Sequence, residues 1–448
     1  MKKQFVTIAV GLLTVLTTGA ADYDQDAPFG FCTRSSRTDK TSTYTITGGG
    51  CHTYPLPAAF KGKSIVLKSN GEDMKNTISN AFNSYDVIIF DGSGGDFIVS
   101  SNIAVPSNRT LLGINKARLT TKWFVTKEIK DKLDAAGVPN MSTSSGGSTL
   151  PNGTPVNEEC EYNTRRILIE LTGDTKENYR NSGLLSLSKC SNVIIRNLTF
   201  QGPGSIDVGG KDLISATQAT HCWVDHCTFM DGQDGNFDIT QKSNYFTVSW
   251  CTFSYTDRSY MHQNTNLIGS SDSETTGYLN TTFAFNWWGT GCKQRMPMAR
   301  VGKIHMLNNY FTCSGSSNCI NPRKNSEFLV EGNYIATGVN NYYGQSGAIA
   351  VTWKSDNLVA ASKKTHSSFG STVTVPYDYS VAPANEVPTV VKAGAGPTLF
   401  AGNPTPVQTP VASTENPTTS KYTYSLSGQR IGSNYRGLVI KNGRKTLR

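Results

Sequence analysis

The chain has 448 residues, with 42 Lys and Arg against 33 Asp and Glu, so its formal net charge is +9 at pH 7. This basic surplus favours polyanionic partners such as nucleic acid, acidic lipid or acidic polysaccharide. The sequence contains no basic run interleaved with aromatic residues, which argues against a nucleic-acid groove. The length is enough for one elongated domain or for two compact ones.

Residues 1–21 are predicted to form a secretory signal peptide. Lys2 and Lys3 precede an apolar run over residues 5–16, and Ala20 and Ala21 provide small residues for cleavage. The apolar run is shorter than the roughly 18 residues of a membrane span, and no later segment reaches that length. We therefore expect a bacterial protein that is secreted to the medium or the cell surface and has no membrane span.

The region after the signal peptide is expected to close one end of a larger β-structure. Met74, Ile78 and Phe82 recur at helical spacing within residues 71–83, which predicts a short N-terminal capping helix. Residues 122–165 include a stretch rich in Gly, Ser and Pro, and they are predicted to form a long lateral insertion loop.

The middle of the chain repeats a short pattern. Runs of β-branched or aromatic residues end in Asn or Cys at intervals of 23 to 35 residues, and a second series of strand-like segments falls between them. Such intervals are typical of a solenoid, and their unevenness argues against a propeller, while a β-sandwich is the other alternative. We therefore predict an all-β domain over residues 22–400, a right-handed parallel β-helix with about 4.8 Å between coils. At this spacing a stacked amide ladder is expected from Asn197, Asn286, Asn309 and Asn333.

Two further features concern the tail and the cysteines. Residues 401–420 are predicted to be a Pro/Thr-rich linker, and residues 421–448 a docking or sorting tail with two short strands around Gly428 and Gly437. Ten cysteines suit an oxidising compartment. Pairing of Cys313 with Cys319, and of Cys32 with Cys51, is compatible with the spacing. The sequence has no CxxC pair, which weakens a zinc site.

Three aspartates lie at the starts of predicted strands. Asp234 and Asp238 are four residues apart, so an extended strand presents both on one face, and Asp212 preceding Leu213 lies about one coil earlier. Three carboxylates on one lateral face repel one another, and a hard cation with oxygen ligands, such as Ca²⁺, relieves that repulsion. Solvated aspartates at strand ends are the alternative.

Arginines accompany these carboxylates in the same repeat. Arg295 and Arg300 flank Pro297, and Arg258 follows Asp238 by twenty residues. A pair of carboxylates could serve a glycoside hydrolase. A set of arginines on the same face instead favours an acidic sugar, because guanidinium groups bind carboxylates in a bidentate manner.

From about residue 29 to residue 396 the chain resembles the pectate lyases of the first polysaccharide-lyase family. The motifs that carry the resemblance are Trp223-Val224-Asp225-His226, Asp234-Gly235-Asn236-Phe237-Asp238-Ile239, Thr247-Val248-Ser249-Trp250, Leu267-Ile268-Gly269-Ser270-Ser271-Asp272, Arg295-Met296-Pro297-Met298-Ala299-Arg300 and Asn308-Asn309-Tyr310-Phe311. The resemblance implies a parallel β-helix that cleaves α-1,4-polygalacturonate by Ca²⁺-dependent β-elimination, giving 4,5-unsaturated oligogalacturonides.

The resemblance also implies roles for single residues. Asp212, Asp234 and Asp238 match the family's calcium-binding carboxylates, Arg295 its catalytic base, and Arg300 a substrate-binding arginine. Arg258 stands where the family has a substrate-binding lysine, and about six extra residues, from Tyr260 to Thr265, precede Leu267. Asp225 and His226 are interpreted as structural.

We expect a monomer that binds polygalacturonate or pectin and no nucleic acid. A pectin lyase acting on methyl-esterified substrate without calcium is one alternative. A non-catalytic β-helix that binds acidic polysaccharide is another.

Overall fold

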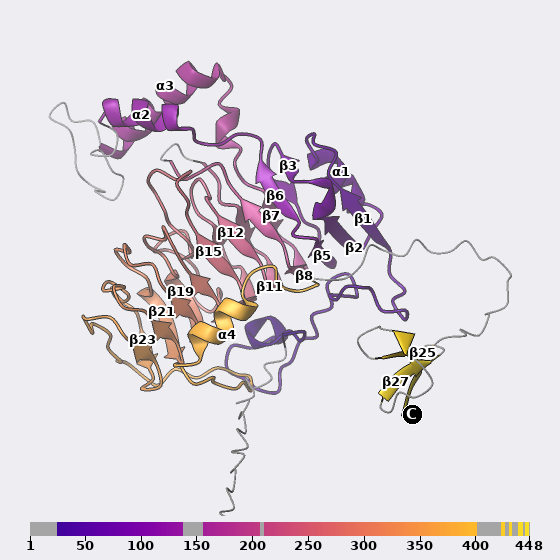
Figure 1. The fold of residues 1–448 in the computed structure, drawn as a ribbon. Helices are drawn as coiled ribbons and strands as arrows, with labels where there is room; N and C mark the ends of the chain where they lie inside the picture. Colours follow the sequence, from indigo (N-terminus) through magenta and orange to yellow (C-terminus); the bar gives the residue numbers. More distant parts are fainter. Residues whose placement is uncertain are drawn as a thin grey trace, which may run out of the picture. The chain divides into compact units, whose positions relative to one another are not determined.

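Three walls of short parallel strands make up the main body of the molecule (Figure 1). The computed structural model describes residues 25–137, 156–206 and 210–400, together with four short strands between residues 423 and 447. The chain passes from wall to wall and then starts the next coil, so each strand pairs in parallel with its equivalent one coil away. The predicted parallel β-helix is confirmed.

The first wall holds the longest strands and joins the second through β19 and β21, so the two form one 15-stranded sheet. Its strands are β1 (Ser64–Lys68), β2 (Val87–Asp91), β5 (Arg109–Ile114), β8 (Ser191–Arg196), β11 (Thr220–Asp225), β14 (Asn244–Ser249), β17 (Thr281–Ala284), β19 (Met298–Leu307), β21 (Asn321–Glu331) and β23 (Ala350–Trp353). The second wall adds β4 (Ile103–Ala104), β7 (Leu185–Ser188), β10 (Ile214–Thr217), β13 (Phe237–Thr240) and β16 (Leu267–Ile268).

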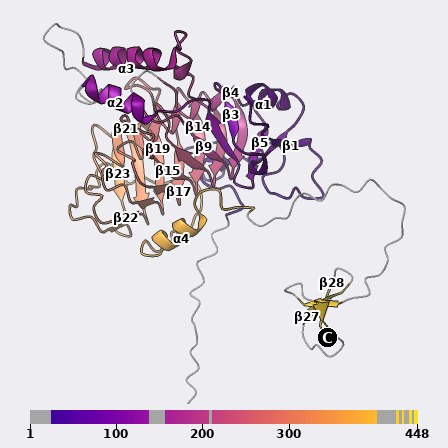
Figure 2. The same cartoon turned by 45° about the horizontal axis from the view of Figure 1, so that its top comes forward.

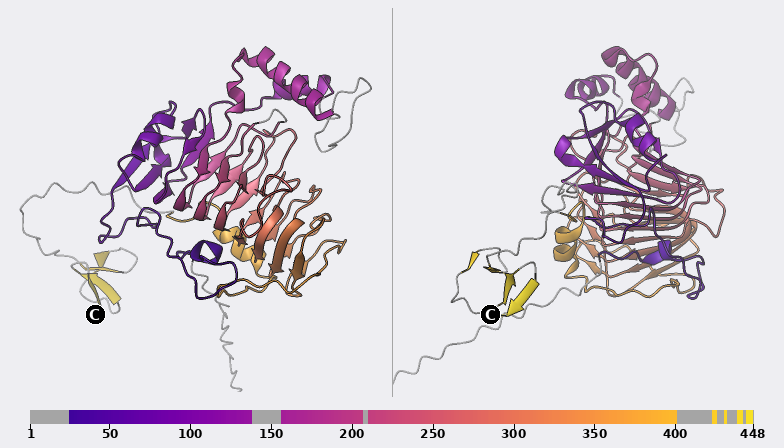
Figure 3. Two further views of the ribbon diagram at one scale, coloured as in Figure 1. Left: turned by 180° about the vertical axis from the view of Figure 1, so that it is seen from behind. Right: turned by 90° about the vertical axis from the view of Figure 1, so that its right-hand side faces the viewer.

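The third wall is a separate sheet of nine short strands. They are β3 (Phe97–Val99), β6 (Arg118–Thr121), β9 (Thr199–Gln201), β12 (Thr228–Met230), β15 (Thr252–Ser254), β18 (Trp287–Trp288), β20 (Tyr310–Phe311), β22 (Tyr334–Ile335) and β24 (Leu358–Val359). Figure 3 shows the walls from behind, with successive coils stacked along one axis.

Stacked aromatic side chains fill the interior of the coils. The rings of Phe200, Phe229, Phe253, Trp288 and Phe311 come from successive coils of the third wall, with neighbouring centroids 4.9 to 5.4 Å apart. Parallel register forces equivalent residues into contact, so one aromatic per coil yields a continuous stack. This interior holds the coils in register and thereby fixes the positions of the loops between the walls.

The predicted asparagine ladder exists but is shifted in the sequence. Asn286, Asn309 and Asn333 each donate an amide hydrogen bond to the asparagine of the next coil, ending at Asn357, with N···O distances of 2.9 to 3.1 Å. Asn197 is not part of it, so that prediction was wrong. The Asn197 amide instead donates to the carbonyls of Gly113 and Leu399, both at 2.8 Å.

The reason is the conformation of the corner that precedes the ladder. Asn197 takes the left-handed conformation with φ 60°, as do His226, Trp250, Phe285 and Asn308 at the equivalent corner of later coils, with φ between 48° and 55°. Asn tolerates this conformation better than most residues. Asn197 is therefore a corner residue, one position before the ladder.

Helices cover the end and one side of the coils. The predicted capping helix is α1 (Lys75–Ala81), and α4 (Val387–Gly394) packs on Trp250 and Phe285. No helix among the described residues combines the length and the apolar character that crossing a bilayer requires.

The Asp225 carboxylate accepts from Arg196 at 2.8 Å and Ser249 at 2.6 Å, and it is fully buried, as a structural residue would be.

The insertion predicted as a loop over residues 122–165 contains helices instead. Figures 1 and 2 show α2 (Lys127–Ala135) and α3 (Val156–Thr172) packed side by side, outside the walls. The hydroxyl of Thr126 caps α2 by accepting from the N–H of Ile129 at 3.3 Å. Ile129 and Leu133 are buried against Leu168 of α3, which stabilises the pair.

The cysteines and the tail also differ from the predictions. All ten cysteines are buried thiols, and the predicted Cys32–Cys51 pairing is not found, because these residues pack in separate clusters. The sulfur atoms of Cys313 and Cys319 lie 3.8 Å apart without a bond.

The tail has four antiparallel strands instead of two: β25 (Thr423–Ser425), β26 (Arg430–Ile431), β27 (Leu438–Lys441) and β28 (Arg444–Leu447). The predicted linker 401–420, the signal peptide, Gly428 and Gly437 lie outside the described residues.

Candidate active site

The candidate residues lie on one row of loops, those that lead from the third wall to the second. The described segments 202–206 and 210–213 lie between β9 and β10, and loops 231–236, 255–266 and 289–297 follow β12, β15 and β18. Single parallel bridges join Gly235 to Asn264 and Asn264 to Gln294, so these loops remain in register from coil to coil. The row carries Asp212, Asp234, Arg258 and Arg295, and Asp238 follows on β13.

Two of the aspartates converge above the backbone of Gly235. The position of a Cβ atom on Gly235 lies 2.7 Å from Asp212 Oδ1 and 3.2 Å from Asp238 Oδ1. Asp212 Oδ2 accepts from the hydroxyl of Ser215 at 2.9 Å, and Asp238 Oδ1 accepts from the N–H of Leu267 at 2.9 Å. Asp212 Oδ1 has no hydrogen-bond partner among the described residues. The missing side chain of Gly235 therefore leaves a cradle for a small cationic ligand.

The third aspartate faces a histidine that the sequence did not single out. His262 Nε2 lies 2.8 Å from Asp234 Oδ1, and the carboxylate is about half exposed. His262 belongs to the six extra residues before Leu267. Asp234 is thus near the cradle in sequence but turns its carboxylate toward the inserted segment.

The electrostatics of the three carboxyl groups differ accordingly. Burial, together with the charge of Asp234, raises the pKa of Asp212 to about 7. Burial and the charge of Asp212 raise the pKa of Asp238 well above its ordinary value. Burial acts in the same direction on Asp234, yet the hydrogen bond and charge of His262 bring its pKa below the ordinary value. The cradle is therefore a place where negative charge is costly without a cation.

Arg295 lies two coils further along the same row. Its positive charge lowers the pKa of all three aspartates, so its guanidinium is within electrostatic range of the cradle. Among the described residues the guanidinium makes no hydrogen bond or ion pair. Arg295 is therefore available to a ligand that reaches the cradle.

Arg300 and Arg258 are held by other groups. Arg300 on β19 pairs with Asp272 at 3.1 Å and donates to the carbonyl of Gly269 at 2.7 Å. Burial and the charge of Arg323 lower the pKa of Arg300, and the charge of Arg295 acts in the same direction. Arg300 and Arg323 therefore place positive charge next to Arg295.

Arg258 lies on the loop between that of Gly235 and that of Arg295, and its side chain reaches back to the loop after β9. It donates to the carbonyl of Gly202 at 2.9 Å, and its guanidinium carbon lies 4.8 Å from the ring centre of Phe124. Burial lowers its pKa, and the charges that act on it come from Asp231, Arg118 and Asp96, not from the three aspartates. Its substrate-binding role stays a prediction.

A comparison with known protein families supplies the identity. The family model described as pectate lyase matches residues 159–396, more than half of the chain, and this range contains all six candidate site residues. The chain belongs to the pectate lyase family. A pectate trisaccharide-lyase of Thermotoga maritima is 40% identical over 139 residues, covering 29% of this chain and 36% of that protein. A probable pectate lyase A of Neosartorya fischeri is 34% identical over 227 residues, covering 48% of this chain and 66% of that protein.

The matched region thus spans about a third of the Thermotoga relative and about two thirds of the fungal one. The structure of a Bacillus subtilis pectate lyase with an arginine-to-lysine substitution has a TM-score of 0.50 at 19% identity, covering 83% of this chain and 99% of that chain. At this identity the likeness establishes the fold alone.

Pectate lyases generally depend on Ca²⁺, and the cradle can be tested for its fit to this ion. No three Asp, Glu, His or Cys side chains in the described part of the chain already converge on one metal position. The cradle nevertheless fits a hard cation, because two carboxylate oxygens face one point and Asp212 Oδ1 lacks a partner. Asp234 completes the set only if it turns from His262 or contributes its second oxygen.

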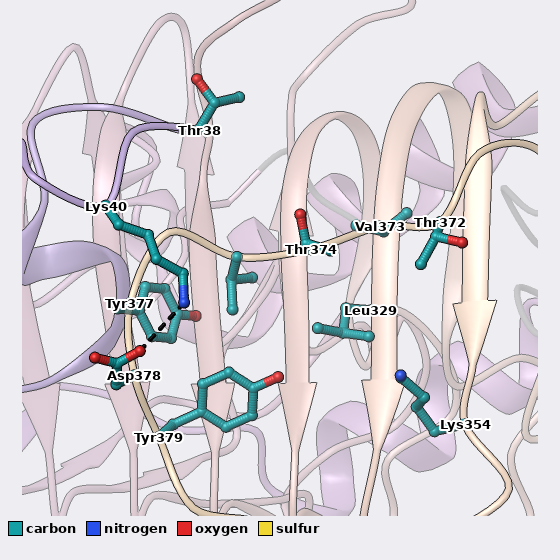
Figure 4. A pocket seen from close by; sticks show the side chains of 11 residues that line it. Thr38, Lys40, Leu329, Lys354, Thr372, Val373, Thr374, Tyr377, Asp378 and Tyr379 are labelled. Atoms are coloured by element: carbon teal, nitrogen blue, oxygen red, sulfur yellow. Dashed lines mark hydrogen bonds and ion pairs between the residues drawn. The ribbon is translucent and has the colours of Figure 1, made fainter.

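A different cavity lies on the first wall, away from this row of loops. It has a volume of about 440 Å³ and lies between Leu329, the segment 372–379 and the N-terminal segment around Lys40 (Figure 4). Lys40 and Asp378 form an ion pair across it at 3.2 Å. Its single carboxylate is already paired, so we assign the function to the cradle.

Sequence reasoning missed His262 and Gly235. Gly235 was part of the quoted motif, but only the register between coils shows that its missing side chain makes room between two carboxylates. His262 lies in an insertion, and the only signal that pointed to it was the extra length before Leu267.

Proposed function

We propose that this protein is a secreted pectate lyase that cleaves α-1,4-polygalacturonate by Ca²⁺-dependent β-elimination and releases 4,5-unsaturated oligogalacturonides. The observation that carries the proposal is the cradle above Gly235, where oxygens of Asp212 and Asp238 face one point under the field of Arg295. An acidic polymer needs both a cation for its carboxylates and a positive surface, and this row of loops offers a place for both.

Each residue has a distinct role in the proposal. Asp212, Asp234 and Asp238 hold the cation. When bound, Ca²⁺ neutralises the uronate carboxylate and stabilises the negative charge that develops as the neighbouring proton leaves. Arg295 removes that proton from C5, the bond between C4 and the glycosidic oxygen breaks, and the leaving oxygen takes up a proton from solvent. A double bond between C4 and C5 remains at the non-reducing end of the fragment that lost the proton.

The remaining arginines bind substrate. Asp272 and the Gly269 carbonyl occupy two nitrogens of Arg300, and the third is left for a uronate carboxylate. Arg258 keeps the positive charge of the lysine expected at its position but stacks on Phe124, so it holds the polymer in a different direction.

The first experiment measures the ultraviolet absorbance of the unsaturated uronide in purified protein with polygalacturonate, with Ca²⁺ and then with a chelator. We expect a rise in absorbance that the chelator abolishes. Arg295→Lys should abolish the rise while polymer binding persists, whereas the control Arg166→Lys, on exposed α3 surface, should behave as wild type. If Arg295→Lys both cleaved and bound the polymer as wild type does, the assignment of Arg295 as the base would be contradicted.

Two alternatives give different results in the same assay. A pectin lyase would produce the absorbance rise on methyl-esterified pectin regardless of chelator. A non-catalytic binding protein would retain polygalacturonate in a pull-down and produce no rise on either substrate. The carboxylate cradle favours the unesterified substrate, because a methyl ester has no negative charge for a cation to bridge.

A further inference from the structure

The α2–α3 insertion encloses a cavity that the proposed chemistry does not use. The cavity has a volume of about 620 Å³, enough for a sugar unit with its water. It lies between the start of the insertion at Lys122 and Trp123, its end at Thr172–Asn181, and Ser100 and Ser101 of the preceding coil. The same segments that distinguish this chain from a plain β-helix therefore build this cavity.

The wall of the cavity contains polar groups for which the protein provides no partner. Tyr179 is 2% exposed, and its hydroxyl has no hydrogen bond among the described residues; nor has Nε1 of Trp123, whose ring packs edge-on against Tyr179 with centroids 6.4 Å apart. Buried donors of this kind are rare and cost stability unless a ligand or water completes them. Both residues line the cavity, so these two donors are groups of its wall that lack a partner among the described residues.

Two carboxylates, of Asp73 and Asp174, and one ammonium, of Lys122, line the cavity. The Asp174 carboxylate accepts from the N–H groups of Lys176 and Tyr179, and Asp73 accepts from those of Lys75 and Ser100. Both acids are thus satisfied by backbone donors.

Lys122, by contrast, is exposed and makes no ion pair within the described residues, although its charge helps to lower the pKa of Asp73. A single free cation next to an aromatic ring and unpartnered donors matches a sugar that carries a carboxylate.

The cavity borders the cradle. Asn181 lines it, and the next residue, Ser182, exchanges hydrogen bonds with the backbone of Lys211 at 3.0 and 3.3 Å. Lys211 directly precedes Asp212. Since Leu185 pairs with Ile214, the end of the insertion lies one coil from the cradle, on the side opposite to Arg295. A linear polymer running along the row from Arg295 past the cradle reaches this cavity next.

We propose that this cavity is an additional subsite for a uronate unit of the polymer whose neighbouring units occupy the cradle. Lys122 pairs with the uronate carboxylate, and Trp123 Nε1 and Tyr179 Oη donate to its hydroxyl or ring oxygens. The inference rests on the proposed function, since the polymer is the one that the cradle binds.

The test measures the affinity of oligogalacturonides of increasing length by calorimetry, beside cleavage of polygalacturonate. Wild-type affinity should rise once the oligomer spans both sites. Lys122→Ala should remove this gain, which we expect to be about two- to fivefold, the size of one solvent-exposed ion pair. Lys176→Ala, an equal loss of charge in the same insertion but outside the cavity wall, should retain the gain.

A second variant separates binding from structure. Tyr179→Phe removes only the unpartnered hydroxyl, so a purely structural residue would give equal or higher thermal stability with unchanged binding. The subsite requires weaker binding of long oligomers in a protein at least as stable as wild type. If both variants cleaved the polymer and still bound longer oligomers more tightly, as wild type does, the subsite alone would be overturned. If wild type bound no oligogalacturonide, both proposals would be overturned.

Discussion

Gly235→Ala is the sharpest test of the cradle, because it adds one methyl group and removes no ligand. Gly235 does not have a positive φ, so an alanine fits its backbone. Its Cβ atom would lie 2.7 Å from Asp212 Oδ1, a distance that real Cβ atoms essentially never show, and 3.2 Å from Asp238 Oδ1. The Asp212 carboxylate must therefore rotate away, and the methyl group would occupy the place of the cation.

The expected magnitude follows from these contacts. Calcium binds oxygens at about 2.3–2.6 Å, so a rotated Asp212 leaves the ion with at least one ligand fewer. Disturbing the positions of metal ligands typically costs about 10- to 100-fold in affinity, or about 1.4–2.7 kcal/mol. The cost to folding should be about 1–3 kcal/mol, because rotation of the carboxylate also disturbs the hydrogen bond from Ser215 to Asp212 Oδ2.

The assay is calorimetric titration of Ca²⁺ into wild type and variant, with a melting curve in chelator to check folding. Gly289→Ala is the matched control, because it lies on the same row of loops, has no positive φ, and its Cβ would find no atom closer than 3.6 Å. Gly289→Ala should bind Ca²⁺ as wild type does. Equal affinity in Gly235→Ala would refute the cradle.

Three further outcomes are expected. Calcium affinity should weaken as the pH falls below about 7, because protons compete for Asp212, and calcium-free stability should decline as the pH rises from about 4 to 7, since only the unfolded chain ionises this group freely. A flat calorimetric profile from pH 5 to 8 would contradict this. His262→Ala should strengthen calcium binding a few-fold, because it releases Asp234 from its contact with His262. Weaker calcium binding in this variant would contradict the prediction. Asp225→Asn should lower the free energy of unfolding by about 3–5 kcal/mol, because it leaves the fully buried Arg196 without its one buried charge partner, the other being the exposed Asp26. Denaturant unfolding measures this loss, and a change below 1 kcal/mol would contradict it.

The repeat could be predicted from the sequence because each coil must bury the same positions, such as Phe229 and Phe253, against their neighbours. The ladder position of Asn197 was missed by one residue, since an asparagine suits both a left-handed corner and a stacked amide. The even spacing of Asp234 and Asp238 did not place both carboxylates together, because only Asp238 lies on β13, whereas Asp234 lies in the loop before it and faces His262.

The insertions could not be predicted in the same way. Helix α2 was hidden by the Gly/Ser/Pro-rich stretch that follows it, although Ile129 and Leu133 have the helical spacing that buries them. The position of His262 depends on contacts between loops of different coils, and no spacing in the sequence encodes these. The packing of the two insertions on each other is likewise long-range, with the Tyr260 hydroxyl donating to Asp134 at 2.5 Å.

The corner residues have a consequence for how such a molecule can diverge. One corner of each coil is closed by a single left-handed residue, such as Trp250 or Phe285, while the loops from the third wall to the second vary widely in length. Loop length can therefore change without altering the rise from coil to coil. The axial separation between the loop that carries Gly235 and the loop that carries Arg295 can change only in whole coils of about 4.8 Å. The coil spacing thus fixes the intervals along the axis at which the loops can contact a bound polymer. Related proteins can differ in what each loop contacts but not in these intervals.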